Sequence, residues 1–210
     1  EPTEIFQLHI EGTRHMLAAA AEAKVERFVY MSTSGTCAVS TRDHPIADES
    51  APYATTVVRN WPYYLSKIFA EKVALEFHAR KGLPVVVLCP SLLLGPEDEG
   101  LSSSEILFRI QNAEIPAIPP GGINFVDVRD VADATVAAAT QGKAGERYLL
   151  GGPNMTLEAF VVLVAKVCGV QAPTLKTSSR INRAAGRMLG FLEDVGGLEG
   201  DESVAYQMAG

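Results

Sequence analysis

Residues 83–88 have the sequence LPVVVL, and this stretch decides the fold class because it predicts a strand that is buried on both faces. A second apolar run at residues 27–32 predicts another strand of the same kind. Between them, residues 35–62 are rich in turn formers and predict an irregular loop, while residues 63–81 predict a helix that ends at Gly82. Strand, helix and strand in this order indicate an α/β fold with a parallel sheet.

The rest of the chain continues the alternation of strands and helices. Short strands are predicted at residues 123–126 and 147–150, whereas the LLLGP sequence at residues 92–96 predicts a turn. The other predicted helices span residues 3–23, 103–113, 128–140, 157–168 and 178–194. Ser102 and Glu105 form a capping box for the second of these helices. Apolar or small residues at three- and four-residue steps predict the buried face of the first helix: Ile5, Leu8, Gly12, Met16, Ala19 and Ala23.

The composition limits the class of protein and the kind of partner. Of the 210 residues, 47% are hydrophobic and 20% are charged, as expected of a globular domain. The net charge of −7 argues against a nucleic-acid-binding face and against binding to an anionic membrane surface. No apolar run reaches the roughly 18 residues of a membrane-spanning helix, and no signal peptide is evident. The cysteines, Cys37, Cys89 and Cys168, show neither metal-ligand spacing nor a disulfide framework, so we expect no bound metal and a cytoplasmic location.

The sequence YYLSK at residues 63–67 places Tyr63 four residues before Lys67 in a predicted helix. Residues four apart lie above one another on a helix, so the phenol and the ammonium can point into one site. A nearby cation favours the phenolate and would lower the pKa of Tyr63 from its ordinary value of about 10. The pair is therefore a candidate proton donor and acceptor, although an ordinary surface pair has the same spacing.

Two predicted strands lead into polar residues at the same edge of the sheet. The first strand leads into Ser34, and the LPVVVL strand leads into Pro90 and Ser91. Ligands bind at the carboxyl ends of parallel strands, so we expect these residues to meet Tyr63 and Lys67 in one crevice. There the hydroxyl of Ser34 could form a hydrogen bond with a substrate carbonyl.

Five segments form a set whose order and spacing are specific. They are EGT at residues 11–13, FVYMSTS at 28–34, YYLSK at 63–67, CPSLLLGP at 89–96 and FVDVRDVA at 125–132. This set resembles the extended short-chain dehydrogenase/reductases, also called the NAD-dependent epimerase/dehydratase family, over nearly the whole chain. The PSLLLGP and YYLSK segments are most similar to the branch related to dihydroflavonol reductases.

The resemblance implies an architecture and a reaction. Residues 1–95 would be the C-terminal part of a Rossmann-like, doubly wound domain, incomplete at its N-terminus. Residues 96–210 would form mostly a small substrate-binding region, with residues 123–150 interleaved with the first domain. The reaction would transfer hydride between NAD or NADP and the carbonyl or alcohol carbon of a small molecule.

The resemblance also implies roles for single residues. Ser34 would hold the substrate oxygen, Tyr63 would act as acid and base, and Lys67 would lower the pKa of Tyr63. The residues expected to contact the cofactor are Tyr63, Lys67, Pro90, Ser91 and Leu93. Arg129 falls where the family often brings a residue towards the substrate.

Two features depart from the family pattern. His9 stands where the family usually has asparagine, which puts in doubt a contact made by that side chain. The chain also has no Gly-x-x-Gly-x-x-Gly turn, which in the family cradles the pyrophosphate. Since the chain begins at Glu1 without a methionine and opens directly into a predicted helix, we expect a fragment that lacks roughly 70–90 residues. The choice between NAD and NADP would depend on that segment.

Alternatives stay open at this stage. A nucleotide-sugar epimerase or dehydratase with tightly bound NAD would use the same three residues, and a non-catalytic dinucleotide-binding protein would share the fold. Asp127 and Asp130 could be catalytic carboxylates, but capping of a helix N-terminus is the better interpretation. The helices over residues 3–23 and 63–81 pair across subunits in many relatives, so a homodimer is expected by analogy.

Overall fold

The computed structural model describes residues 2–41, 46–101 and 103–178. The chain divides into two compact units. The first consists of the residues up to Gly95 together with Phe125–Gly152, and the second consists of Pro96–Asn124 and the chain from Pro153 onward. The assignment of substrate binding to the second unit stays a prediction. Among the described residues, no helix is both long and apolar enough to cross a membrane.

The first unit is built on a parallel sheet of three strands in the order β1 (Phe28–Met31), β2 (Val85–Pro90) and β5 (Arg147–Leu150). The register places Val29 beside Val86. The central strand β2 is buried along its whole length, as its uninterrupted apolar sequence predicts.

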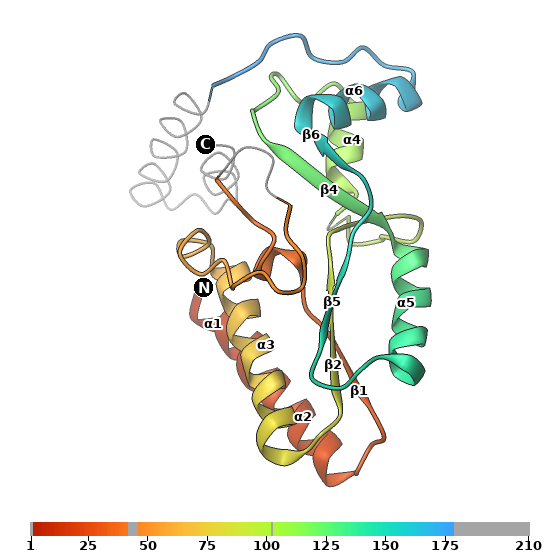
Figure 1. The fold of residues 1–210 in the computed structure, drawn as a ribbon. Helices are drawn as coiled ribbons and strands as arrows, with labels where there is room; N and C mark the ends of the chain where they lie inside the picture. The colour runs from red at the N-terminus through yellow and green to blue at the C-terminus, as the bar shows by residue number, and fades with distance from the viewer. Residues whose placement is uncertain (1, 42–45, 102, 179–210) are drawn as a thin grey trace. The chain divides into compact units, whose positions relative to one another are not determined.

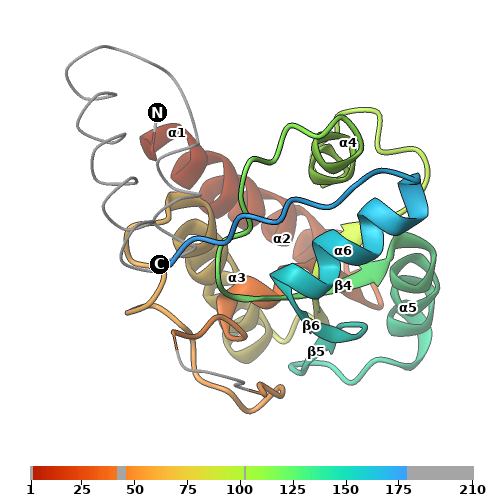
Figure 2. The same cartoon turned by 90° about the horizontal axis from the view of Figure 1, so that it is seen from above.

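Helices cover both faces of this sheet (Figures 1 and 2). On one face, α2 (Gly12–Glu22) and α3 (Pro62–Lys81) enclose a buried core that includes Leu17, Ala70, Ala74, Val85, Val87 and Cys89. On the other face, α5 (Val128–Gln141) covers Val86 and Leu88 through its Ala138. Successive residues of β2 therefore point to opposite layers, as the two-residue period of a strand requires. This arrangement confirms the predicted Rossmann-like α/β fold.

The helix predicted over residues 3–23 is present but has three parts. These are α1 (Pro2–Phe6), a π-helical turn η1 (Gln7–Glu11), and α2. The predicted buried face is wrong, because Leu8 and Met16 are 70% and 62% exposed. A π turn holds more residues than an α turn, so one apolar stripe cannot run straight through it.

The turn predicted at residues 92–96 is also wrong in part, because β3 (Leu92–Leu94) is a strand. It pairs in parallel with β4 (Gly122–Asp127), a partner that lies far along the chain and leaves no local signal. The carboxylate of Asp127 then caps α5 by accepting a hydrogen bond from the backbone N–H of Arg129 (2.8 Å), which confirms the predicted capping role of Asp127.

In the second unit, the start of β4 pairs antiparallel with β6 (Asn154–Thr156). The helix α6 (Leu157–Cys168) follows at once. The Thr156 hydroxyl accepts a hydrogen bond from the N–H of Ala159 (3.1 Å), and Gly169 ends the helix with a φ of 69°. Both ends of this helix lie where the sequence predicts them.

The helix α4 (Glu105–Gln111) is shorter than predicted. The carboxylate of Asp98 accepts hydrogen bonds from the N–H groups of Ser103 (3.1 Å) and Ser104 (2.8 Å) before the helix begins. Ser102, which was expected to cap it, lies outside the described residues, as does the helix predicted over residues 178–194 beyond residue 178.

Candidate active site

The end of β1 is followed by three residues with hydroxyl groups, Ser32, Thr33 and Ser34, at the carboxyl edge of the parallel sheet. After Met31 the chain forms a short 3-10 turn, η2 (Ser34–Thr36). The Thr33 hydroxyl accepts a hydrogen bond from the N–H of Gly35 (3.3 Å), so Thr33 caps this turn. Ser34 is half-buried, and its carbonyl accepts hydrogen bonds from the two residues that follow the turn. Ser34 thus lies at a strand end of the kind that binds ligands.

Tyr63 lies in the first turn of α3, directly after Pro62, a residue suited to the first position of a helix. The Tyr63 ring packs edge-on against the rings of His9 and Tyr64, with centroid distances of 5.5 and 5.2 Å. Burial by these and other neighbours raises the pKa of Tyr63, because it disfavours the charged phenolate.

Lys67 lies one turn further along α3. Its Nζ donates a hydrogen bond to the carbonyl oxygen of Met31 (2.7 Å) and lies 5.0 Å from the ring centroid of Tyr30. Burial lowers the pKa of Lys67, while Glu71 opposes that shift. The pKa of Tyr63 is thus raised although the residue is 46% exposed, and the Lys67 ammonium is directed at β1. A lowering of this pKa by Lys67 stays a prediction.

The turn that follows Ser34 fits closely against the start of α3. A Cβ atom at Gly35 would overlap the ring of Tyr64. That ring is held in place by the rings of Trp61 and Tyr63, at centroid distances of 5.7 and 5.2 Å. Since Gly35 follows Ser34 and Tyr64 follows Tyr63, this contact brings the expected serine and tyrosine into the same part of the first unit. Trp61 therefore contributes packing beneath the site.

The residues predicted to contact a cofactor lie where β2 passes into β3. Pro90 is the buried last residue of β2, and Leu93 lies in β3 with its side chain partly covered. The N–H of Ser91 donates to the carbonyl of Leu150 (2.9 Å). Among the described residues, the Ser91 hydroxyl is buried and has no hydrogen-bond partner. A buried hydroxyl without a partner is costly, so this atom is suited to contact a bound molecule.

Arg129 does not join this group through any contact of the described residues. Its guanidinium binds the carboxylate of Asp127 at 2.9 and 2.5 Å, and its side chain is 74% exposed. The same contact lowers the pKa of Asp127 to about 2. A substrate-binding role for Arg129 would require the guanidinium to leave this partner.

His9, which stands where the family usually has asparagine, contacts the helix that carries Tyr63 and Lys67. The Ser66 hydroxyl lies 2.7 Å from His9 Nδ1 and donates to the carbonyl of Tyr63, also at 2.7 Å. Burial lowers the pKa of His9, and the positive charge of Lys67 adds to this effect. A pocket of about 330 Å³ lies beside His9 and is also lined by Thr13, Tyr30 and Lys67. His9 therefore packs on the Tyr63 ring and lines the same pocket as Lys67.

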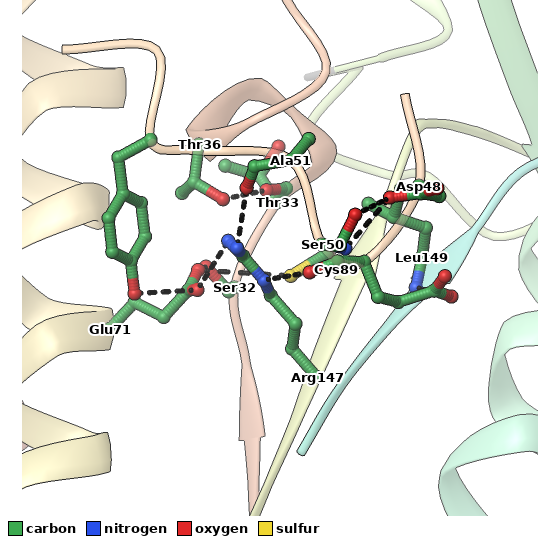
Figure 3. A network of polar contacts seen from close by, with 12 residues as sticks. Ser32, Thr33, Thr36, Asp48, Ser50, Ala51, Glu71, Cys89, Arg147 and Leu149 are labelled. Atoms are coloured by element: carbon green, nitrogen blue, oxygen red, sulfur yellow. Dashed lines mark hydrogen bonds and ion pairs between the residues drawn. The ribbon is translucent and has the colours of Figure 1, made fainter. Parts of the chain in front are cut away.

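The sequence prediction missed Glu71, which is fully buried on α3. Its carboxylate accepts hydrogen bonds from Ser32 and Tyr53 and forms an ion pair with Arg147 (Figure 3). The available signal was its spacing, because Glu71 follows Lys67 by the same four residues that separate Lys67 from Tyr63.

Comparison with known proteins agrees with this geometry. The sequence profile of the NAD dependent epimerase/dehydratase family matches residues 1–151. The chain is 35% identical to a Synechocystis sp. protein provisionally named dihydroflavonol 4-reductase, over 80% of this chain and 50% of that protein. It is 30% identical to cinnamoyl-CoA reductase 1 of Arabidopsis thaliana, over the same shares of the two chains. The chain thus spans about half the length of these curated relatives.

A solved structure shows the same fold. The crystal structure of gox2253 superposes with a TM-score of 0.83 at 30% identity, covering 99% of this chain and 64% of that one. The residues matched by the family profile include β1 with its following turn and the whole of α3. The chain belongs to the NAD-dependent epimerase/dehydratase family, the extended short-chain dehydrogenase/reductases, and is related to NAD(P)-dependent reductases.

Proposed function

We propose that the full-length protein is an NAD(P)-dependent oxidoreductase that interconverts a carbonyl and an alcohol in a small molecule. The proposal is supported by two contacts near the carboxyl end of β1. The Lys67 ammonium donates to the Met31 carbonyl, and the turn after Ser34 packs at Gly35 against the ring of Tyr64, the residue after Tyr63. A hydroxyl donor, a phenol and a cation in one place form a set that can protonate a carbonyl oxygen. The reductase names of the curated relatives support the same reaction class.

The cofactor would be NAD or NADP, whose nicotinamide gives or takes the hydride when bound. The buried Ser91 hydroxyl without a partner fits a contact with such a molecule. Pro90 and Leu93 would pack against it from the β2–β3 junction, and Tyr63 and Lys67 would reach it from α3. Lys67 can donate to a ribose hydroxyl because an ammonium has three N–H groups and Met31 takes one of them.

In the reducing direction, Tyr63 would donate its phenolic proton to the substrate oxygen as the substrate carbon gains the hydride. The raised pKa of Tyr63 suits this role, since the phenol keeps its proton at neutral pH. Ser34 would donate a hydrogen bond to the same oxygen. The phenolate left on Tyr63 would be stabilised by the nearby charge of Lys67 until a proton returns.

Replacing Tyr63 with phenylalanine in the full-length protein tests the proposal. Tyr63→Phe removes the only proton donor assigned to the substrate oxygen, so we expect kcat to fall by at least about a hundredfold. Tyr64→Phe is the matched control, because it removes a hydroxyl from the next residue of the same helix and should change kcat by less than about threefold. Near-full activity of Tyr63→Phe would refute the assignment.

A second measurement tests which hydroxyl donates a hydrogen bond to the substrate oxygen. Ser34→Ala and Thr33→Val each remove one hydroxyl at the end of β1. We expect Ser34→Ala to lower kcat more than Thr33→Val, since the Thr33 hydroxyl already caps η2. The opposite order would move the role to Thr33.

A nucleotide-sugar epimerase or dehydratase is the enzymatic alternative, and the name of the matched family favours keeping it. An epimerase regenerates its cofactor in every turnover, whereas a reductase consumes one nicotinamide for each carbonyl reduced. Measuring that stoichiometry separates the two. Binding of dinucleotide without turnover across a panel of carbonyl compounds would instead indicate a non-catalytic binding protein.

We also propose that the protein works as a homodimer through α1–α2 and α3. Leu8, Met16 and Phe69 on these helices are 70%, 62% and 40% exposed, which is unusual for large apolar side chains so close together in the fold. The proposal of a cytoplasmic location, without nucleic-acid or membrane partners, rests on the cysteine pattern and the net charge of −7.

A further inference from the structure

One carboxylate, that of Glu71, joins segments from four parts of the first unit (Figure 3). Its Oε2 accepts a hydrogen bond from the Ser32 hydroxyl at 2.5 Å, and the Cys89 thiol lies 3.8 Å from the same oxygen. Its Oε1 accepts from the Tyr53 hydroxyl at 3.1 Å and lies 3.4 Å from a guanidinium nitrogen of Arg147. These partners come from the end of β1, from β2, from the loop before α3 and from the start of β5.

The burial of the Glu71 carboxylate and of its partner Arg147 carries a cost in free energy. Glu71 is fully buried and the Arg147 side chain is only 15% exposed. Removing such a pair from water often costs as much as the ion pair returns, and apolar replacements are frequently as stable. Stability alone is therefore a weak explanation for Glu71, and its effect on the position of its partners needs to be considered.

Two side chains of α3, one helical turn apart, form hydrogen bonds with neighbouring residues at the end of β1. Lys67 donates to the carbonyl of Met31, and one turn later Glu71 accepts from the hydroxyl of Ser32. Two successive turns of the helix thus bind the last residue of β1 and the residue after it, which fixes both the distance and the register between helix and strand end. Ser34 lies two residues beyond Ser32, and Tyr63 lies one turn before Lys67.

We infer that Glu71 is a positioning residue that sets Ser34 against Tyr63 by holding the Ser32 hydroxyl. This inference rests on the proposed oxidoreductase function, because it assigns Glu71 a role in that site. The other contacts of Glu71, with Tyr53 and Arg147, bind the loop before α3. Arg147 donates to the carbonyls of Ala51 (2.7 Å) and Glu49 (3.1 Å) and stacks over the ring of Tyr53, so the loop before α3 is bound to the same carboxylate from the other side.

Two hydroxyl deletions around the same carboxylate provide the test in the full-length protein. Ser32→Ala removes the bond that reaches the β1 end directly, whereas Tyr53→Phe removes a bond to the loop, which reaches the turn through the Ala54 N–H that donates to the Thr36 carbonyl (2.8 Å). Both variants lose one hydrogen bond to Glu71, so similar falls in melting temperature are expected. We expect Ser32→Ala to lower kcat by about tenfold or more, since small displacements of reacting groups are costly, and Tyr53→Phe to change it by less than about threefold.

Hydrogen exchange gives a readout that does not depend on activity. The amides of Thr36, Cys37 and Ala38 donate to the carbonyls of Thr33 and Ser34, so they report the hold on this turn. In Ser32→Ala these amides should exchange about tenfold faster, as expected for loss of a hydrogen bond to a charged group, while Tyr53→Phe leaves them unchanged.

Two outcomes overturn the inference: equal losses of kcat in the two variants, or unchanged exchange at the turn in Ser32→Ala. Failure of the proposed function has a different signature. If the wild-type protein reduces no carbonyl, the oxidoreductase proposal falls, and if Tyr63→Phe keeps its activity, the role of Tyr63 falls. In both cases the exchange comparison still decides whether Glu71 holds the Ser34 turn.

Discussion

Replacing Arg147 with methionine should destabilise the protein more than any other single arginine replacement in the first unit. The Arg147 guanidinium faces the carboxylate of Glu71, which is fully buried, so water cannot solvate the carboxylate in place of the lost cation. Methionine fills a similar volume, so the cost of a cavity is small. What remains is a buried carboxylate without its cation, and breaking such a pair costs about 3–5 kcal/mol in the free energy of unfolding.

Arg27 offers a matched control for this measurement. It is half-buried and donates to the carbonyls of Ala138 (3.3 Å) and Gly142 at the end of α5. Among the described residues it has no carboxylate partner, so Arg27→Met removes a donor to the Gly142 carbonyl but leaves no unpaired charge, and the Ala138 carbonyl still accepts from the Gly142 N–H (3.2 Å). Its expected cost is only about 1–2 kcal/mol.

Urea unfolding of the full-length variants measures both costs. If the stranded charge is the cause, adding Glu71→Gln to Arg147→Met should recover part of the loss, although Glu71→Gln alone destabilises the wild-type protein. The reasoning fails if Arg147→Met costs no more than Arg27→Met. It also fails if Glu71→Gln is equally destabilising with and without Arg147.

Two further predictions concern pH and assembly. Burial lowers the pKa of His9 from its ordinary value of about 6.5, so the unfolded state binds more protons there, and stability is lost as the pH falls below about 6.5 through the folded pKa. His9→Asn should therefore narrow the difference between the urea midpoints measured at about pH 5 and at about pH 7.5. An unchanged difference would contradict this prediction. In sedimentation, Met16→Glu should convert the full-length protein from dimer to monomer, whereas Leu175→Glu, at an equally exposed residue (62%), should leave it dimeric. A monomeric wild-type protein or a dimeric Met16→Glu variant would refute the proposed interface.

The parts of the fold that depend on local patterns could be predicted from the sequence. The LPVVVL strand, the helix ended by Gly82 and the helix begun by Thr156 lie within a few residues of their predicted positions, because propensity and capping act over short distances. The strand β3 could not be predicted, since three leucines become a strand only when a distant partner lies beside them. The part of Asp98 before α4 could not be predicted for a similar reason, because this carboxylate lies outside the expected capping motif.

For the candidate site, the sequence predicted the elements that carry Ser34, Tyr63 and Lys67, but not the electrostatics of these residues. Ser34, Tyr63 and Lys67 lie near one edge of the sheet, yet the pKa of Tyr63 shifts in the direction opposite to the prediction. Spacing along a helix gives the direction of a side chain, whereas a pKa depends on burial and on the partner chosen by the cation. Glu71 was missed because a glutamate in a helix is usually solvated, and only the packing of β1 and β5 around it excludes water.

The close fit of Gly35 against the Tyr64 ring has a consequence for how this site can evolve. A larger residue at position 35 needs a smaller side chain at position 64, so neither position can change freely while the other stays. Lineages that enlarge residue 35 should therefore have first exchanged the aromatic ring at position 64. An alignment of relatives should show these two positions varying together, even though they lie in segments separated by the whole loop before α3.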